Sequence, residues 1–177
     1  GLQKALVEPE NFTRFIGPVL RTPLDKLVYF LRYAEESLPT VFEELRKEFV
    51  KPENLVRLLD VALQAFPHQL SYFLRYAEDS LPTVFEELRK EFVKPENLDR
   101  VLGVAKRAPL GKLSAFLRYT KKSLPAVHSG IADYLSSDEG RAVLARAMVD
   151  EPIDSLVSVL RGDILKTTFK RAFLEIG

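Results

Sequence analysis

A segment of 27 residues occurs twice in this chain with a single difference. Residues 29–55 and 72–98 lie 43 positions apart and are identical except that Glu36 is replaced by Asp79. Residues 115–127 repeat part of the same segment at the same offset. Self-similarity at a fixed period of about 20 to 50 residues is typical of proteins built from repeated structural units. The 43-residue period therefore sets the length of the unit from which this chain is built.

The same offset divides the chain into units with recognisable first residues. Pro9, Pro52 and Pro95 each open a Pro-Glu-Asn sequence, and Asp138 opens a degenerate Asp-Glu-Gly at the fourth position. The chain starts with Gly1 rather than Met, from which we expect a segment of a longer protein. The predicted organisation is a flank over 1–8, repeats over 9–51, 52–94 and 95–137, and a divergent fourth repeat over 138–177.

Each unit is predicted to contain three helices that are separated at prolines. In the second unit, apolar residues recur at helical spacing after Pro52, Pro67 and Pro82, and no stretch alternates as a strand does. A proline in the first turn of a helix costs no hydrogen bond. Ser80, before Leu-Pro, is expected to cap the third helix. The predicted fold is therefore all-α, with about twelve helices and breaks near Pro23, Pro39, Pro52, Pro67, Pro82, Pro95, Pro109, Pro125 and Pro152.

The apolar face of each second helix should form the centre of the core. The most buried residues are expected to be Leu31, Leu74, Leu117 and Leu160, with Phe30, Phe73 and Phe116. A three-helix unit of this size has apolar surface that it cannot cover alone, so neighbouring units should stack on one another. This predicts an α-solenoid of four tandem repeats that form one domain.

The 43-residue period and the three-helix unit resemble armadillo and HEAT repeats. The resemblance covers nearly the whole chain and is one of architecture, without a diagnostic motif of either family. It implies a non-catalytic scaffold that presents a long surface to a peptide or another protein.

The composition excludes several kinds of chemistry. The chain has no cysteine, and its two histidines, His68 and His128, have no metal-ligand spacing around them. No glycine-rich phosphate loop occurs. No apolar run approaches the roughly 20 residues of a membrane-spanning helix. We therefore expect no enzyme activity, no cofactor, no metal and no membrane span.

The candidate binding residues are tyrosines and arginines at one edge of the second helix of each unit. On a helical wheel they fall outside the apolar stripe, and they recur at the 43-residue offset. Tyrosine and arginine dominate binding hot spots. The alternative is structural: the tyrosines pack against the neighbouring unit, and each arginine pairs with a carboxylate such as Glu36 or Asp79. The candidate partner-binding residues are Tyr29, Arg32, Tyr33, Tyr72, Arg75, Tyr76, Arg118 and Tyr119.

A second candidate surface is the stretch where the copies differ. Near-identity ends after Leu55, and residues 56–71 vary between units. Either a recent duplication covered only the identical tract, or this stretch contacts a ligand that differs along the array. In the second case the ligand would be contacted by positions such as Arg21, Gln64 and Arg107, or by the turn around Asp25, His68 and Gly111.

Three classes of function remain open from the sequence. A protein-binding scaffold agrees with the repeats and with the missing catalytic residues. A nucleic-acid-binding repeat would use the recurring arginines and tyrosines, but 26 basic and 25 acidic residues give a net charge of only +1. A self-assembling spacer would extend end to end. The salt dependence of binding and concentration-dependent light scattering would distinguish these classes.

Overall fold

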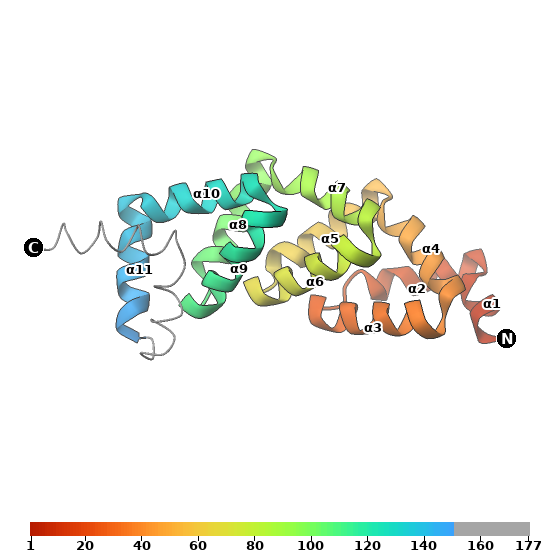
Figure 1. The fold of residues 1–177 in the computed structure, drawn as a ribbon. Helices are drawn as coiled ribbons and strands as arrows, with labels where there is room; N and C mark the ends of the chain where they lie inside the picture. The colour runs from red at the N-terminus through yellow and green to blue at the C-terminus, as the bar shows by residue number, and fades with distance from the viewer. Residues whose placement is uncertain (151–177) are drawn as a thin grey trace, which may run out of the picture. The chain divides into compact units, whose positions relative to one another are not determined.

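The protein is all-α. The structure, a computed structural model, describes residues 1–150, without the side chains of Leu2, Ala147, Met148 and Asp150. This part of the chain forms eleven helices and no strand (Figure 1). They are α1 (Leu2–Val7), α2 (Pro9–Val19), α3 (Leu24–Ser37), α4 (Pro39–Phe49), α5 (Pro52–Gln64), α6 (Pro67–Ser80), α7 (Pro82–Phe92), α8 (Pro95–Lys106), α9 (Leu110–Ser123), α10 (Pro125–Ser136) and α11 (Asp138–Asp150).

The helix boundaries recur with the period of the sequence. The first helices begin at Pro9, Pro52, Pro95 and Asp138, in steps of 43 residues, and the second and third helices begin in the same steps. The predicted breaks at the prolines are confirmed from Pro23 to Pro125. Pro152 and Leu160, and with them the rest of the fourth repeat, lie outside the described residues. The eleven helices thus make three complete helix trios, with α1 before them and α11 after them.

The expected capping serines do not cap the third helices. Ser80 is the last residue of α6, as the equivalent Ser37 and Ser123 are of α3 and α9. The leucines after Ser37 and Ser123 occupy the N-cap positions of α4 and α10 without a side-chain hydrogen bond. One residue, Leu38 or Leu124, therefore separates the second helix from the third. The proline at the first helical position needs no N–H partner, so part of the usual requirement for a cap is absent.

The helices form two compact units. The first contains residues 1–65 and 69–91, and its core includes Leu31, Phe73 and Leu74, all fully buried as expected. Phe30 is only half-buried, and its ring meets the ring of Phe15 edge-on at 5.8 Å between centroids. Identical local sequence therefore does not give Phe30 the burial of Phe73.

The Pro-Glu-Asn sequence fixes the turn between consecutive trios. The buried Asn54 side chain donates a hydrogen bond of 3.0 Å to the carbonyl oxygen of Glu48, near the end of α4. Carbonyls in the last turn of a helix lack intrahelical partners, and this one accepts the Lys51 N–H at 3.1 Å as well as the Asn54 amide. Lys51, at the N-cap position of α5, pairs with the Glu48 carboxylate. The recurring asparagine thus has a structural function.

The second unit contains residues 66–68 and the chain from Phe92 onward. Within it α10 packs on α8, α9 and α11, and Phe116 and Leu117 are buried as expected. Gly140 lies so close to α10 that an added Cβ would be 2.1 Å from the carbonyl oxygen of Tyr134. Ser137 caps α11 by accepting a 3.1 Å hydrogen bond from the Gly140 N–H.

Candidate functional site

The candidate site is a cleft of about 510 Å³ between α3 and α6 in the first unit. Both helices are second helices of their trios, so the cleft lies between equivalent elements of consecutive repeats. All of its lining is polar or aromatic. The lining residues are Arg32, Glu35, Glu36, Tyr72, Arg75, Tyr76, Asp79 and Ser80.

Arg32 crosses from α3 to the aromatic side chains of α6. Its guanidinium carbon lies 5.4 Å from the ring centroid of Tyr72 and 5.7 Å from that of Tyr76. Both distances are within the range of a cation–π contact. Within residues 1–150, Arg32 makes no ion pair with a carboxylate, so the expected pairing with Glu36 does not occur. The guanidinium is therefore held by rings and keeps its N–H groups for solvent or a ligand.

Tyr76 joins the same two helices through its hydroxyl group. The phenol donates a hydrogen bond of 3.0 Å to the Oε2 atom of Glu35. The ring is 5% exposed, and burial together with this acceptor raises the pKa of Tyr76 well above the usual value of a phenol. Tyr76 is thus a neutral hydrogen-bond donor inside the wall of the cleft.

The rim of the cleft is acidic. Glu36 and Asp79, the single difference between the two long copies, are both exposed and form no ion pair within the described part of the chain. With Glu35 they give three carboxylates against the two guanidiniums of Arg32 and Arg75. The rim therefore has one more carboxylate than guanidiniums, and Glu36 and Asp79 are two carboxylates without an ion-pair partner in the described residues.

The candidate tyrosines differ in exposure although they share one pattern. The ring of Tyr29 is 79% exposed, that of Tyr33 55% and that of Tyr72 42%. Tyr76 and Tyr119 are buried, so their rings are not available to a ligand in solution. Arg32, Arg75 and Arg118 are all exposed. The cleft brings together Arg32, Tyr72, Arg75 and Tyr76, whereas Tyr29, Tyr33, Arg118 and Tyr119 are not part of it.

Sequence reasoning did not include Glu35 or Ser80 among the candidate residues. Glu35 lies three positions after Arg32, so both project from neighbouring turns of one helix face. The signal that could have identified it is the joint recurrence of arginine and glutamate at this spacing, as Arg32 with Glu35 and Arg75 with Glu78.

The residues of the alternative surface around the variable turn are mostly exposed. Asp25 and His68 are exposed, Gly111 is half-buried, and the rings of Phe66 and His68 stack with their centroids 6.0 Å apart. A second pocket, of about 260 Å³ between α4 and α7, is lined by side chains that include the ion pair of Arg46 with Glu43.

In residues 1–150, no three histidine, aspartate or glutamate side chains gather in a way that could hold a metal ion. None of the helices in this region combines the length and the apolar character that a membrane-spanning helix needs. No protein-family model matches the chain, and no curated protein or solved structure matches it either.

Proposed function

We propose that this chain is a non-catalytic, protein-binding helical-repeat scaffold in which four 43-residue units stack as an α-solenoid, loosely like armadillo and HEAT repeats. The repeated helix boundaries support this arrangement. Inside the first unit, α6 also lies along α3 through Arg32 and Tyr76, as the stacking of consecutive repeats requires. Small-angle scattering tests the proposal: an elongated particle is expected, and the radius of gyration of a closed bundle would contradict it.

The binding surface that we propose is the cleft between α3 and α6. The observation that carries this proposal is the exposed Tyr72 ring beside two carboxylates, Glu36 and Asp79, that have no ion-pair partner in the described residues. Two carboxylates beside an exposed aromatic ring suit a lysine or arginine side chain, because the carboxylates attract its cationic group and the ring can pack on its aliphatic stem. The partner is therefore a polypeptide segment that contains lysine or arginine.

The same charges count against nucleic acid as the partner. A phosphate that enters the cleft would meet the carboxylates of Glu35, Glu36 and Asp79 as well as the guanidiniums of Arg32 and Arg75. Nucleic-acid affinity comes largely from phosphate contacts and weakens steeply as salt rises. A cleft with one excess negative charge does not provide that attraction.

Selection from a random peptide library tests the proposed site. The peptides retained by the chain should be enriched in lysine and arginine. The double variant Glu36→Gln, Asp79→Asn should weaken their binding by roughly tenfold or more, as expected for loss of charge-assisted contacts. Glu53→Gln is the matched control, since Glu53 is an exposed carboxylate on α5 outside the cleft.

Three results would contradict this assignment. The first is an unchanged affinity in the double variant, or a loss in the Glu53→Gln control as large as that in the double variant. The second is selection of acidic peptides. The third is preferential binding of single-stranded oligonucleotides with a steep salt dependence, which would favour the nucleic-acid alternative.

A further inference from the structure

The short helix α1 corresponds to the end of a third helix. Residues 2–11 read LQKALVEPEN, and residues 45–54, which lie 43 positions later, read LRKEFVKPEN. Six of these ten positions are identical. α1 (Leu2–Val7) therefore occupies the place in the repeat that the second half of α4 occupies one unit later.

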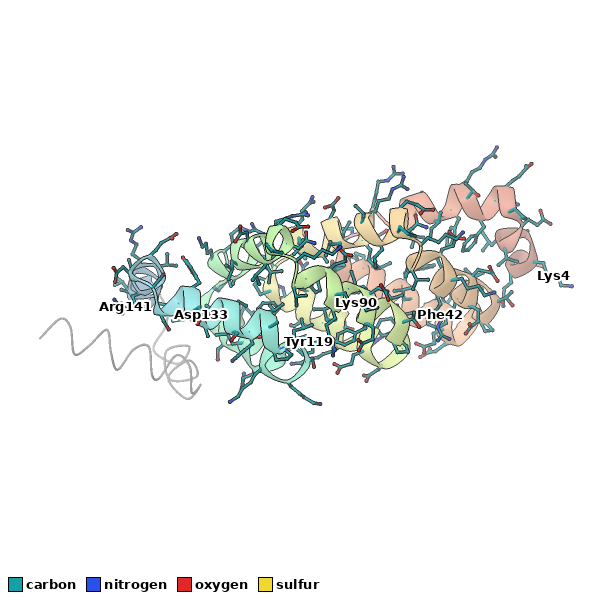
Figure 2. All side chains as sticks on the ribbon, turned by 90° about the horizontal axis from the view of Figure 1, so that it is seen from above. Lys4, Phe42, Lys90, Tyr119, Asp133 and Arg141 are labelled. Carbon is teal, nitrogen blue, oxygen red and sulfur yellow. The ribbon has the colours of Figure 1, made fainter. Side chains whose placement is uncertain are left out.

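The contacts of α1 repeat those of α4. Asn11 donates a hydrogen bond of 2.8 Å to the carbonyl oxygen of Ala5, six residues earlier. Asn54 makes the same bond to Glu48, which is also six residues earlier. α1 packs on α2 as α4 packs on α5, and it also packs on α4, the third helix of the next trio. Lys4 of α1 points away from the neighbouring helices (Figure 2).

On the side of α3 that carries Tyr29 and Tyr33, the described chain places no other second helix. One unit later, α3 fills the equivalent place beside α6 with Arg32 over the rings and Glu35 bound to the Tyr76 phenol. The residues of α3 equivalent to Tyr72 and Tyr76 are Tyr29 and Tyr33, which are 79% and 55% exposed. α1 reaches α3 through the Gln3 side chain, which donates a 3.2 Å hydrogen bond to the Ser37 carbonyl at the far end of the helix.

We propose that Tyr29 and Tyr33 are a docking surface for a helix of this same repeat type, with an arginine followed three residues later by a glutamate. The arginine would lie over the two rings, and the glutamate would accept a hydrogen bond from the Tyr33 phenol. The pair of α3 and α6 is the template for this contact, since the sequences of residues 29–35 and 72–78 are identical. The docking surface is separate from the cleft, so it does not depend on the proposed ligand of the cleft.

The second helices of the third and fourth repeats do not carry this arginine–glutamate pair. In the third trio the second helix is α9, which has Arg118 but carries Lys121 at the position equivalent to Glu35 of α3. In the fourth repeat Arg161 is followed by Ile164 at that position. Neither lysine nor isoleucine can accept the hydrogen bond of the Tyr33 phenol. A second helix from the third or fourth repeat of another copy would therefore leave this docking surface without its acceptor.

An added repeat tests the docking surface directly. A copy of residues 52–94 is fused in front of Pro9 in place of residues 1–8, so that its own Arg75 and Glu78 face Tyr29 and Tyr33. Chemical nitration of Tyr33, followed by peptide mapping, should then be slower than in the original chain. Tyr33→Phe should change the unfolding equilibrium by roughly 3- to 10-fold in the fusion, the net worth of one hydrogen bond. The matched control is the same fusion with Arg75→Ala and Glu78→Gln in the added copy, in which both effects should disappear.

A second measurement uses the original chain. A synthetic 14-residue peptide with the sequence of α6, residues 67–80, should slow the nitration of Tyr33, and the peptide with Arg75→Ala and Glu78→Gln should not. If neither the added repeat nor the peptide protects Tyr33, or if the variant copies protect it equally well, the proposal is wrong. Protection that grows with the concentration of the original chain alone would make a second copy the occupant and would overturn the assignment.

Discussion

The phenol of Tyr76 donates a 3.0 Å hydrogen bond to the carboxylate of Glu35, 41 residues earlier in the chain. This bond joins the second helices of two consecutive repeats. Tyr33 occupies the equivalent position one repeat earlier and has a half-exposed ring. The two tyrosines therefore form a matched pair with identical local sequence and different surroundings.

Tyr76→Phe should lower the free energy of unfolding by about 0.5–1.5 kcal/mol, because it removes one hydrogen bond and leaves the buried ring in place. Urea denaturation followed by circular dichroism measures this change. Tyr33→Phe is the control and should change the free energy by less than about 0.5 kcal/mol, as expected at a surface position. Equal effects at the two positions would show that the bond to Glu35 does not stabilise the fold.

Stability should fall at alkaline pH through Tyr76. Burial, and next the bond to Glu35, raise the pKa of Tyr76 in the folded state above the value of about 10 in the unfolded chain. This contribution to stability is therefore complete below pH about 10 and is lost as the pH rises above it. The ultraviolet absorbance of tyrosinate is measured against pH in the original chain and in Tyr76→Phe. The difference should show that Tyr76 ionises at a higher pH than a free phenol. Ionisation of Tyr76 at pH about 10 would contradict this prediction.

Gly140→Ala should destabilise the second unit by at least about 1–3 kcal/mol. The new Cβ would lie 2.1 Å from the Tyr134 oxygen and 2.7 Å from the Leu135 Cα, and both atoms belong to the backbone of α10. Gly103→Ala is the matched control, since a Cβ there would meet only the Arg107 guanidinium at 3.8 Å. In the helix interior it should stabilise by about 0.5–1 kcal/mol. Thermal unfolding of the two variants should thus shift in opposite directions, and a shared direction would refute the close approach of α10 and α11.

His128 should make the protein less stable at mildly acidic pH. Burial lowers the pKa of His128, whose Nδ1 lies 3.1 Å from the Leu117 carbonyl oxygen, and Lys121 contributes in the same direction. The unfolded chain then binds a proton more readily than the folded one, so stability falls as the pH drops below about 6.5. In His128→Phe this pH-dependent loss should be smaller, because the phenylalanine found at the equivalent Phe42 and Phe85 does not titrate. Denaturation midpoints between pH about 7 and 5 measure the difference, and parallel curves would contradict the prediction.

The helices could be predicted from the sequence because their boundaries are local. A helix cannot continue undisturbed through a proline, because proline has no N–H and its ring clashes with the carbonyl of the preceding turn. The apolar residues between the prolines recur at helical spacing. α1 was not predicted as a helix, since residues 2–7 are too few to show a periodic pattern. Its correspondence to the end of α4 becomes apparent once the Asn11 and Asn54 side chains are seen to make the same bond.

The candidate site could be predicted only in part, because burial of its side chains is not a local property. Residues 29–35 and 72–78 have the same seven amino acids, yet Tyr33 is 55% exposed and Tyr76 is 5% exposed. The difference arises because α3 lies beside Tyr76, whereas the described chain places no second helix beside Tyr33. The helical wheel likewise placed Arg32 off the apolar stripe. It could not show that Arg32 would contact the Tyr72 ring rather than pair with the Glu36 carboxylate.

The single-residue junctions at Leu38 and Leu124 limit how this molecule can change in length. Each junction is a single residue between two helices, so it has no spare residue that could absorb an insertion. An insertion inside a helix would rotate every later side chain by about 100° and move the tyrosines and arginines off their partners. We therefore expect gains and losses of whole 43-residue units, turns included, to preserve the contacts that Arg32 and Tyr76 make between second helices.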